Sequence, residues 1–300
     1  MPVMMQIAVI SGSFLLGHAT TNISTVYRGL GIGLGISSIF CLFQLLGYQP
    51  VVTNGEGDWH PPGLFINPNI LGEISAVVLV ALVFSRAWFI ALLVVPSLLL
   101  SQCRGALLGV AVCGCIYAVQ RWKWRALLAV PVVLGLLVLY THEKNWTLHS
   151  VRTDIWLDTI AGLTFWGNGL GSFGSIFPLH ATRVDTTAVL PVHAHNDFLE
   201  ILFELGAPGL VLFLGFIAAI AYKSEQRERY ILVALGTTAL FGFPLHTPTT
   251  AFVLGIVAGY GARGWDMVRD YKLHSGPDLY EGGKQFAAKL VGGCRTFIPI

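Results

Sequence analysis

The sequence contains few charged residues. Asp, Glu, Lys and Arg make up 11% of its 300 residues, hydrophobic residues make up 54%, and the mean hydropathy is +0.69. A soluble domain carries roughly a quarter charged residues. Because so few polar side chains cannot cover a folded chain in water, an ordinary soluble protein is excluded and an integral membrane protein is predicted. The formal net charge of +2 predicts nothing by itself, since the placement of Lys and Arg matters more in a membrane protein than their sum.

Cysteine is also scarce. Three of the five cysteines lie in apolar runs, one at a helix end and one in the C-terminal tail, so no disulfide framework is indicated. Cys113 and Cys115 are separated by one residue in a predicted helix, where they would point in different directions and form a poor metal pair. We expect a structural role for these side chains.

No basic region precedes the first apolar run, so the N-terminus is predicted to be a membrane span and not a cleavable signal peptide. A bilayer core needs about 20 mostly apolar residues per helix. The candidate spans, several of them short, are 4–25, 29–48, 70–85, 87–101, 105–120, 126–141, 199–222, 230–246 and 249–264. The predicted fold is therefore all-α, a polytopic membrane protein of about nine transmembrane helices. Residues 1–264 would form one domain, followed by a cytoplasmic tail at 265–300.

The basic residues of the connecting loops predict the orientation. RWKWR (Arg121–Arg125) and KSEQRER (Lys223–Arg229) are the densest positive clusters, and such clusters lie on the cytoplasmic side. Alternation of the spans puts three further basic stretches on the same side: Arg28, Arg86 and residues 263–272. Segment 142–198, between spans six and seven, is thus predicted to be one large outer (periplasmic) segment.

Ionisable residues are nearly missing from the middle of the predicted spans. Those that occur lie at or near the outer ends: Glu73, Arg104, Glu200, Glu204 and His246. Ion-coupled transporters usually carry charges near the bilayer midplane. This distribution therefore argues against a transporter and for a functional site at the outer membrane surface.

The most distinctive polar residues lie between Pro191 and Leu210, in PVHAHNDFLEILFELGAPGL. His193, His195 and Asp197 alternate, so on an extended strand they would share one face, as in the H-x-H-x-D metal motif of metallohydrolases. The stretch continues directly into an apolar helix, however, and no further histidine follows Asp197 there. Alternatively, Asn196 or Asp197 would cap that helix, although capping leaves the two histidines unexplained.

The spacing within this stretch is more specific than its composition. His195 and Asn196 are followed by nine residues and then by Gly206 and Gly209, which gives the pattern H-N-x9-G-x-x-G. This pattern resembles the O-antigen ligase and O-antigen polymerase superfamily, whose members are membrane glycosyltransferases that take glycans from polyprenyl pyrophosphate.

Three upstream segments resemble the same family. GLFINPNILGE (Gly63–Glu73) is similar to its G-x-F-x-N-P-N segment, and SQCRGALLGV (Ser101–Val110) is similar to its S-x-x-R-G-A segment. Ser150–Pro178 is similar to its outer-loop signature, in which an Arg is followed by an aromatic residue and a G-x-G-x-F-type turn. The resemblance implies that three residues of these segments contribute to substrate binding: Asn69, Arg104 and Arg152.

The resemblance also implies a lipid-anchored donor with a strongly anionic pyrophosphate leaving group. Fixed positive charge stabilises such a group, and the planar guanidinium of Arg is suited to phosphate oxygens. Arg104 and Arg152 are the candidates, with Arg183 third. Two alternatives are that Arg104 snorkels from a helix end and that Arg152 lies on a solvated outer face.

The acceptor is a sugar hydroxyl, which needs a base to take its proton. Histidine has an unperturbed pKa near 6.5 and can act near neutral pH. His195 matches the family pattern and is the predicted catalytic base, and either Asp197 or Glu200 would orient it. Three residues of this stretch are expected to contact substrate: His193, Asn196 and Asp197. No D-x-D pair occurs in the predicted outer segments, so a nucleotide-sugar donor with a bridging metal is unsupported, and no metal or cofactor is expected.

One further pattern is a weak signal. Residues 169–174, GLGSFG, satisfy the dinucleotide-binding pattern G-x-G-x-x-G. No strand precedes them and no βαβ unit surrounds them. A turn that shapes the glycan cleft is therefore favoured over a dinucleotide site.

The predicted function is transfer of a glycan from undecaprenyl pyrophosphate to an acceptor sugar, with inversion as the family implies, in lipopolysaccharide or polysaccharide biosynthesis. The site would face the periplasm from the bacterial inner membrane. The expected partners are the lipid-linked donor, a lipid- or glycan-borne acceptor and the bilayer, with no nucleic acid. O-antigen polymerase activity and a lipid-linked glycan flippase or transporter are the alternatives.

Overall fold

The computed structural model describes residues 3–48, 61–123, 151–186 and 190–274, with four single positions between 131 and 138 and with side chains as far as residue 263. Within these residues the regular structure is helical, without strands. The α-helices are α1 (Val3–Ala19), α2 (Ile23–Leu45), α3 (Pro68–Phe84), α4 (Trp88–Ser101), α5 (Arg104–Trp122), α7 (Val151–Ala161), α8 (Phe173–Ile176), α9 (Asp197–Lys223), α10 (Gln226–Ala239) and α11 (Pro248–His274). Two 3-10 turns are η2 (Phe177–Leu179) and η3 (Pro244–His246). Most of the predicted span 126–141 and the C-terminal tail beyond residue 274 lie outside the described residues.

Local capping sets several helix boundaries. Asn22 accepts a hydrogen bond from the backbone N–H of Ser24 and starts α2, so the predicted first span at 4–25 extends past the end of α1 at Ala19. Asn67 caps α3 in the same way, with Pro68 at its first position. The predicted span 230–246 is also corrected. Its helix, α10, ends at Ala239, and Pro244 begins the separate turn η3.

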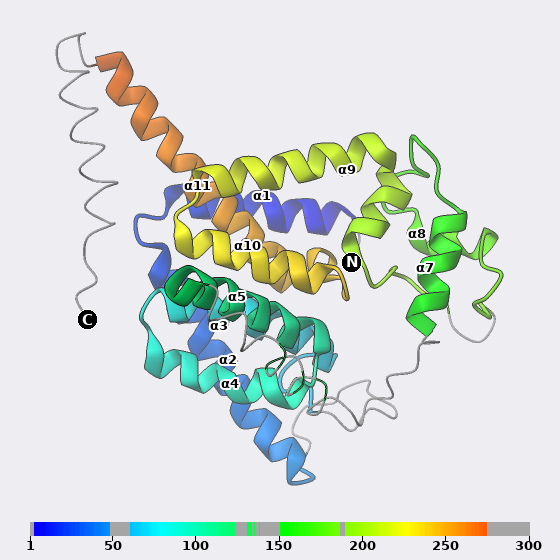
Figure 1. Ribbon diagram of the computed structural model, residues 1–300, viewed down its shortest axis with the longest axis horizontal. Coiled ribbons are helices and arrows are strands. Elements are labelled where there is room, and N and C mark those ends of the chain that lie inside the picture. Colours follow the sequence, from blue (N-terminus) through cyan, green and yellow to red (C-terminus); the bar gives the residue numbers. More distant parts are fainter. Residues whose placement is uncertain are drawn as a thin grey trace.

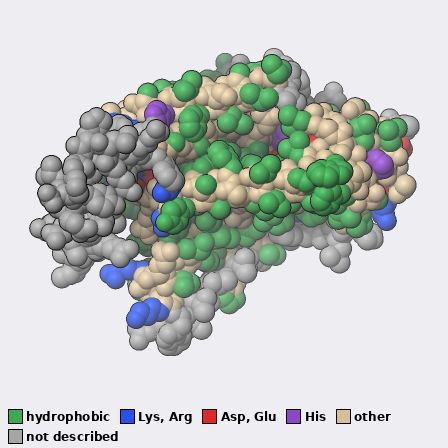
Figure 2. Space-filling model, turned by 90° about the horizontal axis from the view of Figure 1, so that it is seen from above, with side chains coloured by type: hydrophobic (Ala, Val, Ile, Leu, Met, Phe, Trp, Pro, Cys, Tyr) green, Lys and Arg blue, Asp and Glu red, His purple; other side chains and the backbone are tan. Residues whose placement is uncertain are grey.

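Apolar helices make up most of the structure. Three of them, α2, α5 and α9, are long and apolar enough to cross a membrane, while α1, α3 and α4 are apolar but shorter. Hydrophobic side chains cover the middle of the face shown in Figure 2, and the few charged and histidine side chains lie mostly toward its two ends. This distribution is that of a membrane protein.

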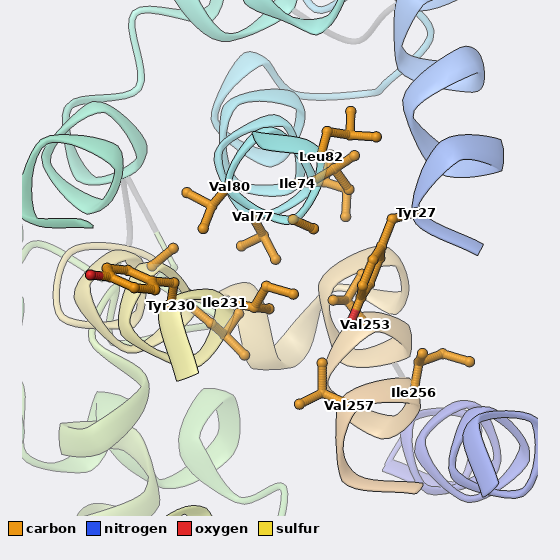
Figure 3. Packing of buried hydrophobic residues seen from close by; sticks show 14 of the residues in the cluster. Tyr27, Ile74, Val77, Val80, Leu82, Tyr230, Ile231, Val253, Ile256 and Val257 are labelled. Carbon is orange, nitrogen blue, oxygen red and sulfur yellow. The ribbon is translucent and has the colours of Figure 1, made fainter. Parts of the chain in front are cut away.

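The core lies where α2, α3, α10 and α11 meet. Tyr27 of α2 is fully buried, together with Val77 of α3, Ile231 of α10 and Val257 of α11, and Figure 3 shows these side chains pointing toward one another. Burial of such side chains stabilises the contact through close packing, which replaces the hydrophobic driving force between helices in lipid.

Helices α1 and α11 approach each other closely. A methyl group at Gly17 would collide with the backbone of Ile256, and one at Gly259 would collide with the backbone of Phe14. Small residues at both positions therefore let the two backbones touch, as is common between membrane helices. Two of the four glycines in GLGIGLG (Gly29–Gly35) of α2 serve a related purpose: Gly31 packs against Leu82 and Ile90, and Gly35 packs against Leu93.

The helices run alternately between two ends of the bundle (Figure 1). At one end, here called the basic end, arginines connect several helices. Arg227 of α10 donates hydrogen bonds to Ser24 and Ser85, and Arg263 of α11 donates one to the carbonyl of Thr20. At the other end, here called the site end, Gln6 of α1 donates to the carbonyl of Leu245. Helices α7 and α8 lie at the site end, beside the start of α9.

Candidate active site

The histidine segment makes a sharp turn immediately before α9. Asn196 is the N-cap of α9, and its side chain accepts a hydrogen bond of 3.0 Å from the backbone N–H of Leu199. His195 has a φ of 54°, in the left-handed region that non-glycine residues rarely adopt. The extended strand on which His193, His195 and Asp197 would share a face is therefore not formed, and the three side chains have different partners. A strained backbone of this kind is often found at functional sites.

His193 is held by Glu200. Its Nδ1 lies 2.9 Å from Oε1 of Glu200, and Oε2 of the same carboxylate accepts a hydrogen bond of 2.8 Å from the backbone N–H of Ala194. Glu200 is one turn into α9 and only 2% exposed. The sequence offered Glu200 as a group that could orient His195, but in the structure the carboxylate binds His193 instead.

Asp197 is held by His246, which comes from the turn between α10 and α11. Oδ1 of Asp197 lies 2.7 Å from Nδ1 of His246, and Oδ2 accepts a hydrogen bond of 2.8 Å from the backbone N–H of Leu245. Nε2 of His246 lies 3.3 Å from Oε1 of Glu200. His193, Glu200, His246 and Asp197 thus form one connected network. The sequence placed His246 near an outer helix end, but nothing in its local pattern linked it to a motif 49 positions away.

His195 lies against Phe243, with the two ring centroids 5.2 Å apart and an angle of 64° between the ring planes. Among the described residues, none hydrogen-bonds to its imidazole. Burial, together with the positive charge of Arg152 and the neighbouring His193, lowers the pKa of His195 to about 4, although Glu200 acts in the opposite direction. The ring is therefore neutral at pH 7, as a proton acceptor must be.

Arg152 lies close enough to this ring to affect its charge, and Arg104 lies near Arg152. Arg152 donates a hydrogen bond of 3.0 Å to the carbonyl of Phe241, in the chain segment that also carries Phe243. Arg104 is the first residue of α5 and close enough to Arg152 for their charges to interact. The neighbouring Gly105 packs against Phe241. The two arginines named from the sequence are thus brought together at one loop from distant parts of the chain.

The segment that contains Asn69 lies beside Arg104. Gly72 of α3 packs against Ser101 and Cys103, which directly precede α5. Asn69 is one turn before Glu73, a fully buried carboxylate that Gly242 contacts closely. The two upstream segments quoted from the sequence therefore meet at the site end, next to the loop after α10.

Arg183 has a different environment. Its guanidinium lies 2.9 Å from Asp158 of α7, and the same carboxylate accepts backbone hydrogen bonds from Thr182, Arg183 and Val184. Burial opposes ionisation of Asp158, but these hydrogen bonds outweigh it and hold the pKa of Asp158 at about 2. The ion pair fixes the chain after η2 against α7, and the described contacts do not connect Arg183 with His195.

The two glycines of H-N-x9-G-x-x-G have a structural explanation. Gly206 interrupts α9 with a φ of 68°, and Ala207 donates a hydrogen bond of 3.0 Å to the carbonyl of Phe165. A methyl group at Gly206 would collide with that carbonyl, and one at Gly209 would collide with Leu205. The kink therefore lets the loop after α7 pack against α9 at Gly206 and Ala207.

The G-x-G-x-x-G segment is attached to the same part of α9. The backbone N–H groups of Gly171 and Phe173 donate to the two carboxylate oxygens of Glu204, at 2.8 and 2.9 Å. The segment ends inside the four-residue α8 and follows no strand in the described part of the chain. This is a turn, as the sequence predicted.

One group of side chains has the composition of a metal site. The ligand atoms of His193, Glu200 and His246 lie within 4.8 Å of one another. This set differs from the H-x-H-x-D set considered from the sequence, because His246 takes the place of His195 and Glu200 that of Asp197. All three side chains are joined by the hydrogen bonds described above, so the geometry also suits a metal-free network.

A cavity of about 610 Å³ opens beside this network. Its polar side is formed by His193, Glu200, Glu204 and His246, and the glycine-containing turn contributes Gly171 and Gly174. Its apolar walls come from three helices: Ile7 and Ile10 of α1, Ile201, Leu205 and Phe213 of α9, and Leu254 of α11. An amphipathic ligand fits a cavity of this composition.

The fold and the site together define a polytopic helical membrane protein with a polar, histidine-containing site at one end of its bundle. Residues 89–214 match the family described as O-antigen ligase. This match supports membership of the O-antigen ligase superfamily, and it includes Arg104, Arg152 and His195 but not Asn69 or His246. None of the curated proteins matches the chain.

Proposed function

We propose that the protein is a membrane glycosyltransferase of the O-antigen ligase type, which moves a glycan from undecaprenyl pyrophosphate to an acceptor sugar. The observation that carries the proposal is the position of a neutral histidine, His195, near Arg152, which in turn lies near Arg104. A base and an anion site are the two groups that this transfer requires.

The chemistry divides between these groups. His195 takes the proton of the acceptor hydroxyl, whose oxygen attacks the anomeric carbon of the donor glycan. The bond between that carbon and the pyrophosphate oxygen breaks, and its electron pair stays on the pyrophosphate. Arg104 and Arg152 stabilise the developing negative charge through hydrogen bonds to phosphate oxygens. Attack from the face opposite the leaving group gives inversion.

The topology predicted from the sequence, with about nine spans and the outer segment 142–198 in the periplasm, belongs to this proposal. It is supported by the alternation of helices between the two ends and by Arg227 and Arg263 at the basic end. The test is labelling of single cysteines in intact spheroplasts with a membrane-impermeant thiol reagent. A cysteine in 142–198 is expected to react and one in 223–229 is not, and the reverse order would contradict the orientation.

Two experiments test the reaction. Purified protein is expected to transfer glycan from a lipid-linked donor without an added metal or cofactor. Expression in two bacterial strains, one lacking only its ligase and one lacking only its polymerase, then separates the two possible acceptors. We expect repair of the lipopolysaccharide profile in the ligase-deficient strain, whereas repair of the other strain alone would identify a polymerase. Repair of neither strain, with no transfer in vitro, would contradict the proposal.

A further inference from the structure

A second cavity lies at the basic end of the bundle, at the opposite end from the histidine network. Its volume is about 240 Å³. Its lining comes from the turn after α1, the turn between α9 and α10, and α11, which Figure 1 shows near one another at this end. Because sites for drug-sized ligands have roughly 300–1,000 Å³, this cavity suits a smaller group.

Ser224 presents a buried hydroxyl to this cavity. The residue is 5% exposed, lines the cavity beside Gly261 of α11, and finds no hydrogen-bond partner for its Oγ among the described residues. A buried hydroxyl without a partner costs about 1–3 kcal/mol. A ligand in the cavity that accepts a hydrogen bond would supply the missing partner.

The start of α10 adds backbone donors. Ser224 and Glu225 line the cavity directly before Gln226, the first residue of this 14-residue helix. The side chain of the N-cap residue, Glu225, makes no capping hydrogen bond. The first N–H groups of a helix lack partners within the helix and carry a partial positive charge, so they attract anions. The hydroxyl and the helix end therefore favour the same kind of ligand, an acceptor with negative charge.

The charged side chains around the cavity favour an anion on balance. Lys223 and Arg263 line it and are cationic, whereas Glu225 lines it and is acidic. Arg227 and Glu228, in the first turn of α10, pair with each other at 2.6 Å and offset one another. Lys223 and Glu225 are both exposed, but Arg263 is half-buried. The charge that water screens least is therefore positive.

The donors reach the cavity from three sides. Thr21 follows α1, Lys223 and Ser224 end α9, and Tyr260 and Arg263 belong to α11. Phosphate oxygens accept hydrogen bonds from guanidinium, ammonium, hydroxyl and backbone N–H groups, and all four kinds occur here. A group with several acceptor oxygens can use donors on three sides at once, so phosphate suits the cavity better than an anion with one acceptor atom.

We propose that this cavity is an anion site that binds a phosphate group, at the end of the bundle opposite the proposed active site. The proposal does not depend on the proposed function. The phosphate comes either from the headgroup of an anionic membrane lipid or from solution, since both present the same oxygens. Basic pockets between membrane helices bind lipid headgroups, and Tyr222, beside Lys223, is 76% exposed, as is typical of an aromatic residue at a membrane surface.

Three variants and one control test the site. Ser224→Ala removes the buried hydroxyl, Lys223→Gln removes one cation, and Glu225→Gln removes the opposing carboxylate. Arg229→Gln is the matched control for Lys223→Gln, because Arg229 is also an exposed cation at the basic end but is not a lining residue of the cavity.

The measurement is thermal unfolding of the purified protein in an uncharged detergent, titrated separately with sodium phosphate and with short-chain phosphatidylglycerol. Sodium chloride at equal ionic strength and short-chain diacylglycerol are the blanks. A saturable rise in unfolding temperature gives the apparent Kd of each probe. A response to both probes identifies a general phosphate site, a response to the lipid alone identifies its headgroup as the ligand, and a response to sodium phosphate alone identifies free phosphate.

The variants should change the apparent Kd in opposite directions. Ser224→Ala and Lys223→Gln are each expected to raise it about tenfold, because each removes a hydrogen bond to a charged group. Glu225→Gln is expected to lower it about threefold, because it removes a repulsive charge. Arg229→Gln should leave it unchanged. No response to either probe in the wild type, or the same Kd in Ser224→Ala and Lys223→Gln as in the wild type, would overturn the proposal.

Discussion

Arg152 and Phe241 are 89 positions apart in the sequence, yet the guanidinium of Arg152 donates a 3.0 Å hydrogen bond to the carbonyl of Phe241. This contact ties the start of α7 to the loop after α10. Since Phe243 of the same loop contacts both His193 and His195, the bond also fixes one wall of the proposed active site. A substitution at Arg152 is therefore expected to change both the charge near His195 and the position of Phe243.

The two histidines should differ in their effect on activity. His195→Ala is expected to reduce transfer by about 10²–10⁴-fold, because it removes the proposed general base. His193→Ala leaves His195 in place and should reduce transfer much less. The measurement is in vitro transfer at matched protein levels, with donor binding as the control. Equal loss in both variants would contradict the assignment of the base to His195.

Replacement of arginine by lysine tests whether a site arginine binds phosphate through the planar fork of its guanidinium or only through its positive charge. Arg152→Lys and Arg104→Lys are each expected to lose at least about tenfold in transfer rate, because lysine keeps the charge but lacks the planar fork. Arg229 is the matched control, since it also donates to a backbone carbonyl, that of Ala221, but lies at the basic end. Arg229→Lys should retain the wild-type rate. Wild-type rates in both site variants would reduce their role to general electrostatics.

The pH dependence of transfer follows from His195. Its pKa is lowered to about 4 in the folded protein, so the ring is unprotonated and able to accept a proton well below pH 6.5. Transfer should therefore stay nearly constant from pH 8 to about pH 6 and fall only as the pH approaches 4. The dependence of kcat/KM on pH gives the pKa of the base in the free enzyme. An acid limb centred near 6.5 would show that a histidine with an ordinary pKa is the base.

The kink in α9 can be tested at two glycines of the same helix. Gly206→Ala places a methyl group against the carbonyl of Phe165 at a φ of 68° and is expected to destabilise the protein by about 1–3 kcal/mol. Gly215→Ala meets open space and should be neutral or slightly stabilising. Thermal unfolding in detergent compares the two. Equal unfolding temperatures of the two variants would mean that the kink in α9 does not depend on glycine at position 206.

A chelator distinguishes the two interpretations of His193, Glu200 and His246. We expect transfer to survive EDTA, because hydrogen bonds already join these three side chains and the proposed reaction uses none of them to hold a metal. Metal analysis of the purified protein is the independent readout. Loss of activity in EDTA, restored by one added divalent metal, would show that the three residues form a metal centre.

The sequence by itself determined the apolar helices, their approximate positions and the residues of the site that lie within local patterns. Membrane helices satisfy their own backbone hydrogen bonds, so a run of apolar residues is enough to identify one. The cap at Asn196 and the spacing from His195 to Gly206 are equally local. His195, Arg104 and Arg152 were named because such local patterns resemble those of a known family.

Only the tertiary structure decided which of these residues meet. His246 binds Asp197 because the turn after α10 folds back onto the start of α9, and no local pattern records a contact between two separate helices. The pairing of Glu200 with His193 and of Arg183 with Asp158 depends equally on packing. The low pKa of His195 has the same origin, since burial and the approach of Arg152 come from the assembled bundle and not from the residues beside His195 in the chain.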